Sequence, residues 1–138
     1  MSAPLLLDTC AAIWILENAP LSDSAVAAID GAADNGKPIF VSPITAWKIG
    51  MLMVRGRLKS ALPPQRWFHR LLDVPGVRLA DMSPEILIAS SFLPGNLRRD
   101  PADRILVATA REHDYVLLTR DAALLDYALE GYVQALAC

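Results

Sequence analysis

Aspartates stand where strands are expected to end or helices to begin. Asp8 directly follows the apolar run Leu5–Leu7, and Asp121 follows a second apolar run near the C-terminus. Asp100 and Asp103 lie at the start of a helical segment that precedes this second run. Because parallel sheets place their sites at the carboxyl ends of the strands, we expect these carboxylates to converge at one edge of a sheet.

The position of Asp103 points to a metal ion. It shares a helical face with Leu106, Val107 and Ala110, and this face is expected to pack on the sheet. A buried carboxylate needs a partner, and a divalent cation serves several carboxylates at once. Hard oxygen ligands favour Mg²⁺ or Mn²⁺ over zinc. The alternative for each aspartate is a helix cap, the role that best suits Asp100, which precedes a proline.

Short apolar strands alternate with amphipathic helices along the chain. Ser-Pro and Asp-Pro pairs at 42–43, 83–84 and 100–101 supply a capping side chain followed by proline at the first helical position. The expected strands are 5–7, 39–41, 77–79, 115–118 and 133–136, and the expected helices are 11–17, 22–35, 43–54, 63–72, 84–94, 101–113 and a short one after Asp121. This alternation predicts an α/β fold with a central parallel sheet of four to five strands, covered on both faces, in a single domain 1–138.

Composition restricts the possible partners. A net charge of −2 gives no global basic field for nucleic acid, so RNA contacts must come from the local clusters Arg55–Lys59 and Arg98-Arg99. The hydrophobic content of 54% exceeds that of most soluble domains and predicts an apolar surface that a partner covers, on the helices around 44–54 and 67–72.

Several other classes of site find no support. No apolar run is long enough to span a membrane, and the start of the chain does not read as a signal peptide. Cys10 and Cys138 show neither disulfide-type nor zinc-type spacing, which fits a reducing cytoplasm. The glycines form no phosphate-binding loop, and His69 and His113 have no recognisable nucleophile motif.

An ordered set of segments resembles the PIN domains of VapC-type toxins over nearly the whole chain. The segments are Leu5-Leu6-Leu7-Asp8-Thr9, Ser42-Pro43-Ile44-Thr45-Ala46-Trp47, Arg55-Gly56-Arg57-Leu58, Asp100-Pro101-Ala102-Asp103-Arg104 with Ala108-Thr109-Ala110, and Leu118-Thr119-Arg120-Asp121. The resemblance implies an α/β/α sandwich and an endoribonuclease that uses Mg²⁺ or Mn²⁺ held by three or four acids. It also implies a homodimer, neutralised by a small antitoxin in a larger hetero-oligomer, with operator DNA reached only through the antitoxin.

The same resemblance assigns roles to individual positions. Asp8, Asp103 and Asp121 match the metal-site acids, and Asp100 matches a neighbour that is frequently acidic. Thr9 and Thr119 match hydroxyl residues that orient these acids. The candidates for gripping the RNA backbone are Arg55, Arg57, Arg98 and Arg99.

One position departs from the family pattern. The family usually has Glu after the helix tryptophan, whereas Lys48 follows Trp47 here, through either natural divergence or an introduced inactivation. We expect the Lys48 ammonium to reach the metal pocket and bond to Asp8 or Asp103 in place of the cation; the alternative is that Lys48 extends from the helix edge into solvent and touches nothing. This leaves two functions open: a nuclease, or an inactive binding module that acts through its antitoxin. A phosphoacceptor receiver domain fits less well, since the adjacent acid pair and the late lysine of receivers are absent.

Overall fold

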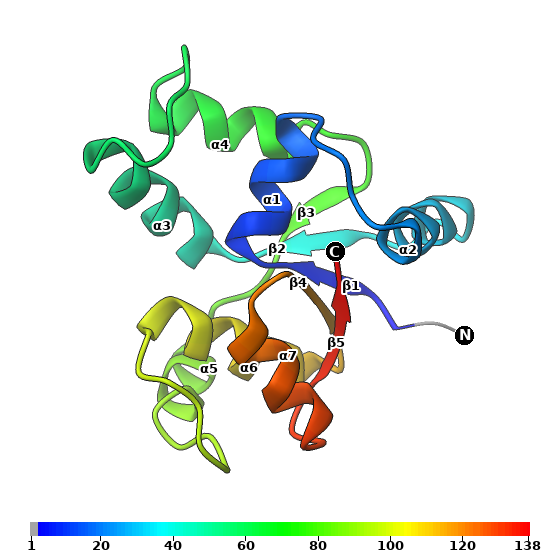
Figure 1. Ribbon diagram of the computed structural model, residues 1–138, viewed down its shortest axis with the longest axis vertical. Coiled ribbons are helices and arrows are strands. Elements are labelled where there is room, and N and C mark those ends of the chain that lie inside the picture. The colour runs from blue at the N-terminus through cyan, green and yellow to red at the C-terminus, as the bar shows by residue number, and fades with distance from the viewer. Residues whose placement is uncertain (1–2) are drawn as a thin grey trace.

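A five-stranded parallel sheet forms the centre of the structure, a computed structural model that describes residues 3–138 (Figure 1). The strands are β1 (Leu5–Leu7), β2 (Ile39–Val41), β3 (Val77–Leu79), β4 (Val116–Thr119) and β5 (Gln134–Ala137), in the order β3-β2-β1-β4-β5. The predicted limits of β1, β2 and β3 are confirmed, and β4 and β5 each lie one residue later than predicted. Tyr115 falls outside β4 because its N–H donates to Ala110 O at the end of the preceding helix.

Helices connect the strands and cover both faces of the sheet. They are α1 (Thr9–Leu16), α2 (Asp23–Asp34), α3 (Pro43–Val54), α4 (Pro64–Leu72), α5 (Pro84–Ala89), α6 (Pro101–His113) and α7 (Ala122–Leu129). Ser42, Ser83 and Asp100 cap α3, α5 and α6 with a proline at the start of each, as predicted. The helix predicted over 84–94 is too long, since α5 ends at Ala89 and leads into a loop that turns at Gly95 with φ +73°.

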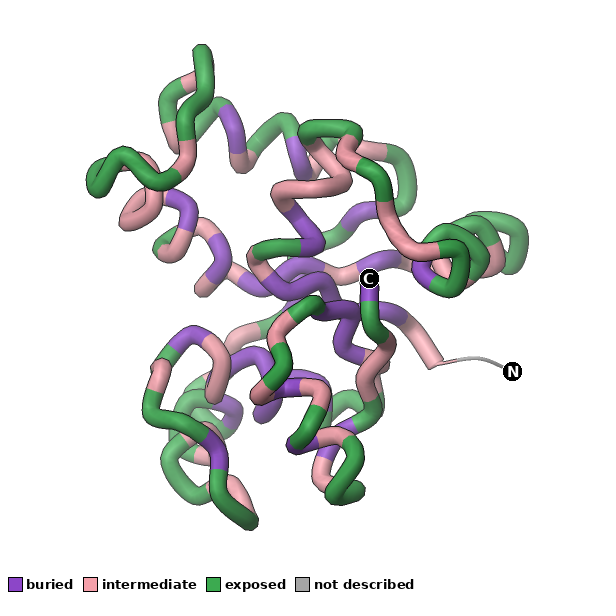
Figure 2. Tube along the Cα trace, viewed as in Figure 1, coloured by how far each residue is buried: buried purple, intermediate pink, exposed green. Residues whose placement is uncertain are grey.

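Alternate side chains of each strand enter different cores. Leu5 and Leu7 of β1 pack with residues of α1, α2 and α4, whereas Leu6 packs with residues of α6 and α7. These buried strands lie between the two helical layers in Figure 2. Burial on both faces explains why β1, β2 and β4 are almost continuous apolar runs rather than alternating ones. The layers form the predicted α/β/α sandwich.

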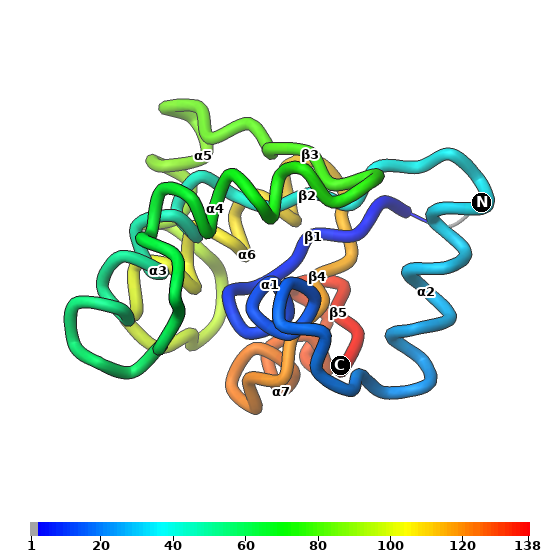
Figure 3. Tube along the Cα trace, turned by 90° about the horizontal axis from the view of Figure 1, so that it is seen from above, coloured from blue at the N-terminus to red at the C-terminus, as the bar shows by residue number. Residues whose placement is uncertain are grey.

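The register of the central strands sets the position of the site. Leu7 of β1 lies opposite Leu118 of β4, and the Asp8 N–H donates to Leu118 O over 3.1 Å. Asp8 and Thr119 therefore leave the sheet side by side, at its carboxyl edge. Figure 3 shows β1 and β4 together at the centre of the molecule, with α1 over them. Within residues 3–138, no helix has the length and apolar character needed to cross a membrane.

Candidate active site

Asp8 is the buried centre of the acidic cluster. It is only 4% exposed, and its Oδ1 accepts a bond of 2.7 Å from the Ala11 N–H because Asp8 caps α1. Its Oδ2 accepts a bond of 2.5 Å from the Thr119 hydroxyl. The same hydroxyl accepts a bond of 3.0 Å from the Asp121 N–H, so Thr119 links two of the predicted acids.

Burial controls the charge of Asp8. Removal from water raises the pKa of Asp8 from 3.8 to about 6, although the bonds from Thr119 and Ala11 favour the ionised form. Asp103 and Asp121 raise this pKa further by charge repulsion. The three predicted metal-site acids therefore lie close enough to influence one another.

Asp100 and Asp121 are helix caps, and each uses only one of its two carboxylate oxygens for the cap. Asp100 Oδ1 accepts from the N–H groups of Ala102 and Asp103, and Asp121 Oδ1 accepts from those of Ala123 and Leu124. In both residues Oδ2 remains for another partner. The cap role and the site role are thus compatible, because each uses a different oxygen of the carboxylate.

Asp103 lies on the buried face of α6, as predicted. Its side chain is 16% exposed, while Leu106, Val107 and Ala110 on the same face are all buried. Burial raises the pKa of the Asp103 carboxyl, against the effect of a bonded Arg98, and repulsion from Asp100 raises it too. The ionised form of this carboxylate is therefore disfavoured, and a nearby cation would stabilise it.

A cation of the chain itself already lies between two of the acids. Arg98 donates to Asp103 Oδ2 from Nε over 3.0 Å and from Nη2 over 2.6 Å, and Nη2 also donates to Asp121 Oδ2. The prediction placed Arg98 on the RNA backbone instead. Its position two residues before Asp100, in reach of the start of α6, was the signal that the sequence offered.

Lys48 also reaches the acids, but not the predicted ones. Its Nζ lies 3.4 Å from Asp100 Oδ2. The expected bond to Asp8 or Asp103 is therefore wrong, because Asp100 at the start of α6 comes nearer to α3. Although burial opposes ionisation, the bond from the Asp103 N–H and the charge of Lys48 lower the pKa of Asp100. Residue 48 thus belongs to the acidic cluster through Asp100.

The remaining predicted residues lie around this centre. Within residues 3–138 the Thr9 hydroxyl has no hydrogen bond, unlike Thr119. Arg99 is exposed and makes no ion pair with any described residue. Arg55 and Arg57 are exposed at the far end of α3, where Arg55 lies about 10 Å along the helix from Lys48.

The apolar surface differs from the predicted one. Trp47 and Val54 are exposed as expected, at 50% and 80%, but Trp67 and Leu71 of α4 are buried. A second exposed apolar group, which was not predicted, follows α4 in the sequence. It consists of Leu87, Ile88 and Phe92, on and after α5. Helical spacing indicated apolar residues there but not which helix would remain uncovered.

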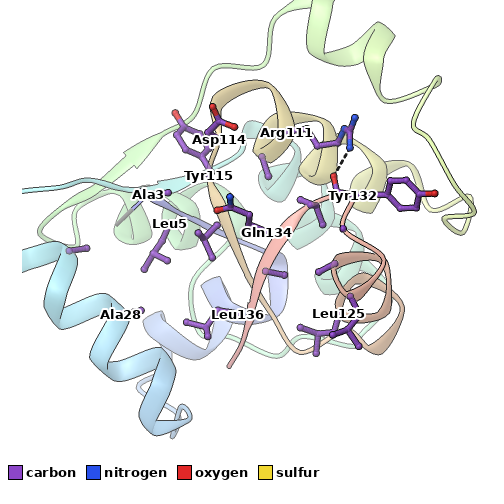
Figure 4. A pocket seen from close by; sticks show the side chains of 18 of the residues that line it. Ala3, Leu5, Ala28, Arg111, Asp114, Tyr115, Leu125, Tyr132, Gln134 and Leu136 are labelled. Carbon is purple, nitrogen blue, oxygen red and sulfur yellow. Dashed lines mark hydrogen bonds between the residues drawn. The ribbon is translucent and has the colours of Figure 1, made fainter. Parts of the chain in front are cut away.

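One cavity lies away from the acidic cluster. It has a volume of about 1070 Å³ and lies between α2 and α7, where Leu5, Val116 and Gln134 mark the amino ends of three strands (Figure 4). The acids lie at the carboxyl ends. The acidic cluster is the stronger candidate for a functional site, because its chemistry is specific and the cavity is lined largely by small apolar side chains.

The donor set of the cluster fits a hard dication. Asp8, Asp103 and Asp121 offer oxygen ligands, which Mg²⁺ and Mn²⁺ prefer. Among residues 3–138, however, no three His, Cys, Asp or Glu residues are arranged as a ready metal cage. Arg98 lies among these acids, with its guanidinium paired to both Asp103 and Asp121. Thr45, one turn before Lys48, has the one buried side-chain oxygen without a partner in the described chain, and it was not predicted.

Residues 5–129 match the PIN domain family. The chain belongs to the PIN domain family. Among known PIN proteins, Ribonuclease VapC22 of Mycobacterium tuberculosis is 32% identical over 121 residues, which cover 87% of this chain and 88% of the relative. The range 5–129 that matches the family contains Asp8, Asp100, Asp103 and Asp121.

Solved structures share the PIN fold at lower identity. VapBC2 from Rickettsia felis, bound to a promoter DNA fragment, has a chain with a TM-score of 0.69 and 15% identity, over 96% of this chain and 97% of that one. A DNA-bound VapBC from Salmonella typhimurium gives a TM-score of 0.66 and 17% identity, over 99% and 98%. These similarities confirm the predicted architecture.

Proposed function

We propose that this PIN domain is the endoribonuclease toxin of a toxin–antitoxin pair and depends on Mg²⁺ or Mn²⁺ held by Asp8, Asp103 and Asp121. The observation that carries the proposal is the convergence of these three carboxylates, from three separate elements, on one edge of the sheet. The relative named Ribonuclease VapC22 supports the same activity.

The side chains divide the work of RNA hydrolysis. A bound dication would supply an activated water and neutralise charge on the phosphate. Asp8 is held in place by Ala11 and Thr119, so its carboxylate needs little reorganisation when it becomes a ligand. Asp121 is fixed by its cap bonds through Oδ1, and its Oδ2, which pairs with Arg98, is the oxygen that could serve as a ligand. Arg55, Arg57 and Arg99 are exposed and suited to phosphate contacts.

Lys48 lowers the activity of this chain in our proposal. Its ammonium lies beside Asp100 at the edge of the cluster and opposes the approach of a dication. The same contact supports the second candidate, a PIN-like module that no longer cuts but still binds its antitoxin. The two functions differ in metal binding and cleavage and agree in the partner.

The proposed partners are an antitoxin and a second copy of this chain. Structural neighbours of this chain occur in VapBC and FitAB complexes, which supports a cognate antitoxin as partner, with operator DNA contacted through it. The exposed apolar group Leu87, Ile88 and Phe92 supports a homodimer, because a patch of this kind is seldom left in water. We place the protein in the cytoplasm, where its RNA substrate is found.

Thermal unfolding with and without Mn²⁺ tests the metal site. Bound Mn²⁺ should raise the melting temperature of this chain, and the Asp103→Asn variant should lose that shift. Cleavage of a mixed RNA substrate, measured with Mn²⁺ and with EDTA, then tests the activity. Equal shifts in both proteins would remove Asp103 from the site. A Mn²⁺ shift without cleavage would favour the binding module.

A further inference from the structure

The guanidinium of Arg98 makes a dense set of contacts with the acidic cluster. It bridges Asp103 Oδ2 and Asp121 Oδ2, of which the second is the oxygen that the cap of α7 does not use. Its side chain remains 47% exposed, whereas the two carboxylates are 16% and 25% exposed. The cation therefore covers the acids from the solvent side, which is the side from which a metal ion would enter.

The loop that carries Arg98 is fixed on several sides. Arg104 donates to Ser90 O over 2.8 Å and to Leu97 O over 3.1 Å, which ties the loop to α6. Tyr127 of α7 donates to Pro94 O over 2.5 Å, and Leu97 itself is buried. An arginine that follows such an anchored segment has a defined starting point, so its pairing with the acids is built into the fold.

The charges at the site show what Arg98 replaces. Asp8, Asp100, Asp103 and Asp121 bring four carboxylates, and Lys48 pairs with Asp100 at the edge. Arg98 pairs with two of the three acids assigned to the metal. Without a cation these like charges would repel one another. A metal ion and the guanidinium need the same two oxygens and cannot both use them fully.

We propose that Arg98 is a built-in counter-cation that occupies the place of the dication in the metal-free protein and must be displaced before the metal binds. This inference rests on the proposed metal-dependent function. It assigns to Arg98 a role in setting metal affinity, in place of a simple RNA contact. The side chain is long and half exposed, so it can move away from the acids without disturbing the core.

Mn²⁺ affinity, measured by titration calorimetry without RNA, tests the proposal. Arg98→Ala should bind Mn²⁺ about five- to tenfold more tightly than the parent, because the competing ion pairs are gone. The matched control is Arg99→Ala, which removes the same charge at the next residue. The Arg99 side chain has no partner among residues 3–138. This control should bind Mn²⁺ within about twofold of the parent. Arg98→Lys keeps the charge but loses the two-pronged contact, and it should fall between the two.

Each measurement is made with Lys48 and again with Lys48→Glu, so that weak metal binding by the parent cannot hide the effect. Without metal, Arg98→Ala should melt at a lower temperature than Arg99→Ala, since the carboxylates lose their cation. Equal Mn²⁺ affinities for Arg98→Ala and Arg99→Ala would overturn the counter-cation role and leave the proposed function standing. Absence of Mn²⁺ binding in every variant would overturn both.

Discussion

Replacing Lys48 by glutamate should convert the edge of the acidic cluster from a barrier to a metal ligand. The Lys48 Nζ lies 3.4 Å from Asp100 Oδ2, so residue 48 is already positioned beside the acids. Glutamate on the same turn of α3 adds one carboxylate and removes one cation. We expect Lys48→Glu to bind Mn²⁺ more tightly and to cleave RNA faster.

The size of the effect follows from Coulomb's law. A dication about 6 Å from a unit charge, at an effective dielectric of about 40, interacts by roughly 3 kcal/mol. The substitution changes the charge by two units, which doubles this figure, and physiological salt reduces it again by about half. The expected gain is therefore about 3 kcal/mol, or roughly a hundredfold in the dissociation constant. Lys48→Gln should give about half the free energy, or roughly a tenfold gain.

The assay is a Mn²⁺ titration followed by RNA cleavage at a Mn²⁺ concentration below the dissociation constant of the parent. Lys59→Glu provides the matched control, because Lys59 is exposed in the loop after α3 and the charge change is the same. It should leave the Mn²⁺ affinity within about twofold of the parent. Without metal, Lys48→Glu should be slightly less stable, because Asp100 loses its partner and gains a like charge.

Two results would refute this reasoning. Equal Mn²⁺ affinities for Lys48→Glu and Lys59→Glu would place residue 48 outside the metal site. Equal cleavage rates for the parent and Lys48→Glu would show that Lys48 does not hold the activity down. A graded series from Lys through Gln to Glu is the signature of an electrostatic cause.

Three further predictions concern stability and assembly. Burial raises the pKa of Asp8 to about 6. The protonated carboxyl therefore makes its full contribution to the free energy of unfolding below about pH 4, and this contribution is lost as the pH rises through 6. Without metal, the free energy of unfolding of Asp8→Asn, measured with urea, should exceed that of the parent by at most about 3 kcal/mol at pH 8 and by almost nothing at pH 4. An equal gain at both pH values would contradict this. Gly95→Ala should cost about 2 kcal/mol by the same assay, since its φ is +73° and the new Cβ would meet the Tyr132 ring, while Gly31→Ala, with open space around it, should not destabilise. Phe92, 80% exposed, should hold a homodimer together, so Phe92→Asp should give a monomer by light scattering where the parent gives a dimer.

The sequence was sufficient for the elements and for the acids that follow them. Strand ends are visible as apolar runs that stop at Asp8 or Thr119, and parallel pairing then brings such positions together. Helix caps at Asp100 and Asp121 were equally readable, because capping is a local property.

The partners of these acids were not readable from the sequence. The position of Arg98 depends on how Arg104 and Tyr127 hold the loop before it, which are tertiary contacts without a local signal. The pairing of Lys48 depends on the distance between α3 and the start of α6, which helical periodicity does not contain. Both pairings involve cations, whose long side chains have many possible partners.

The bond between Thr119 and Asp8 joins residues 111 positions apart. Synthesis proceeds from the N-terminus at about 5–20 residues per second, so the Asp8 side chain waits roughly 6–20 s for its partner to be made. Cys138 contacts the same residue, since its N–H donates to Thr119 O over 3.0 Å. A growing chain on the ribosome therefore carries no finished site until Thr119 and Asp121 have been made. An antitoxin made at the same time thus has the whole period of synthesis to accumulate before there is anything to inhibit.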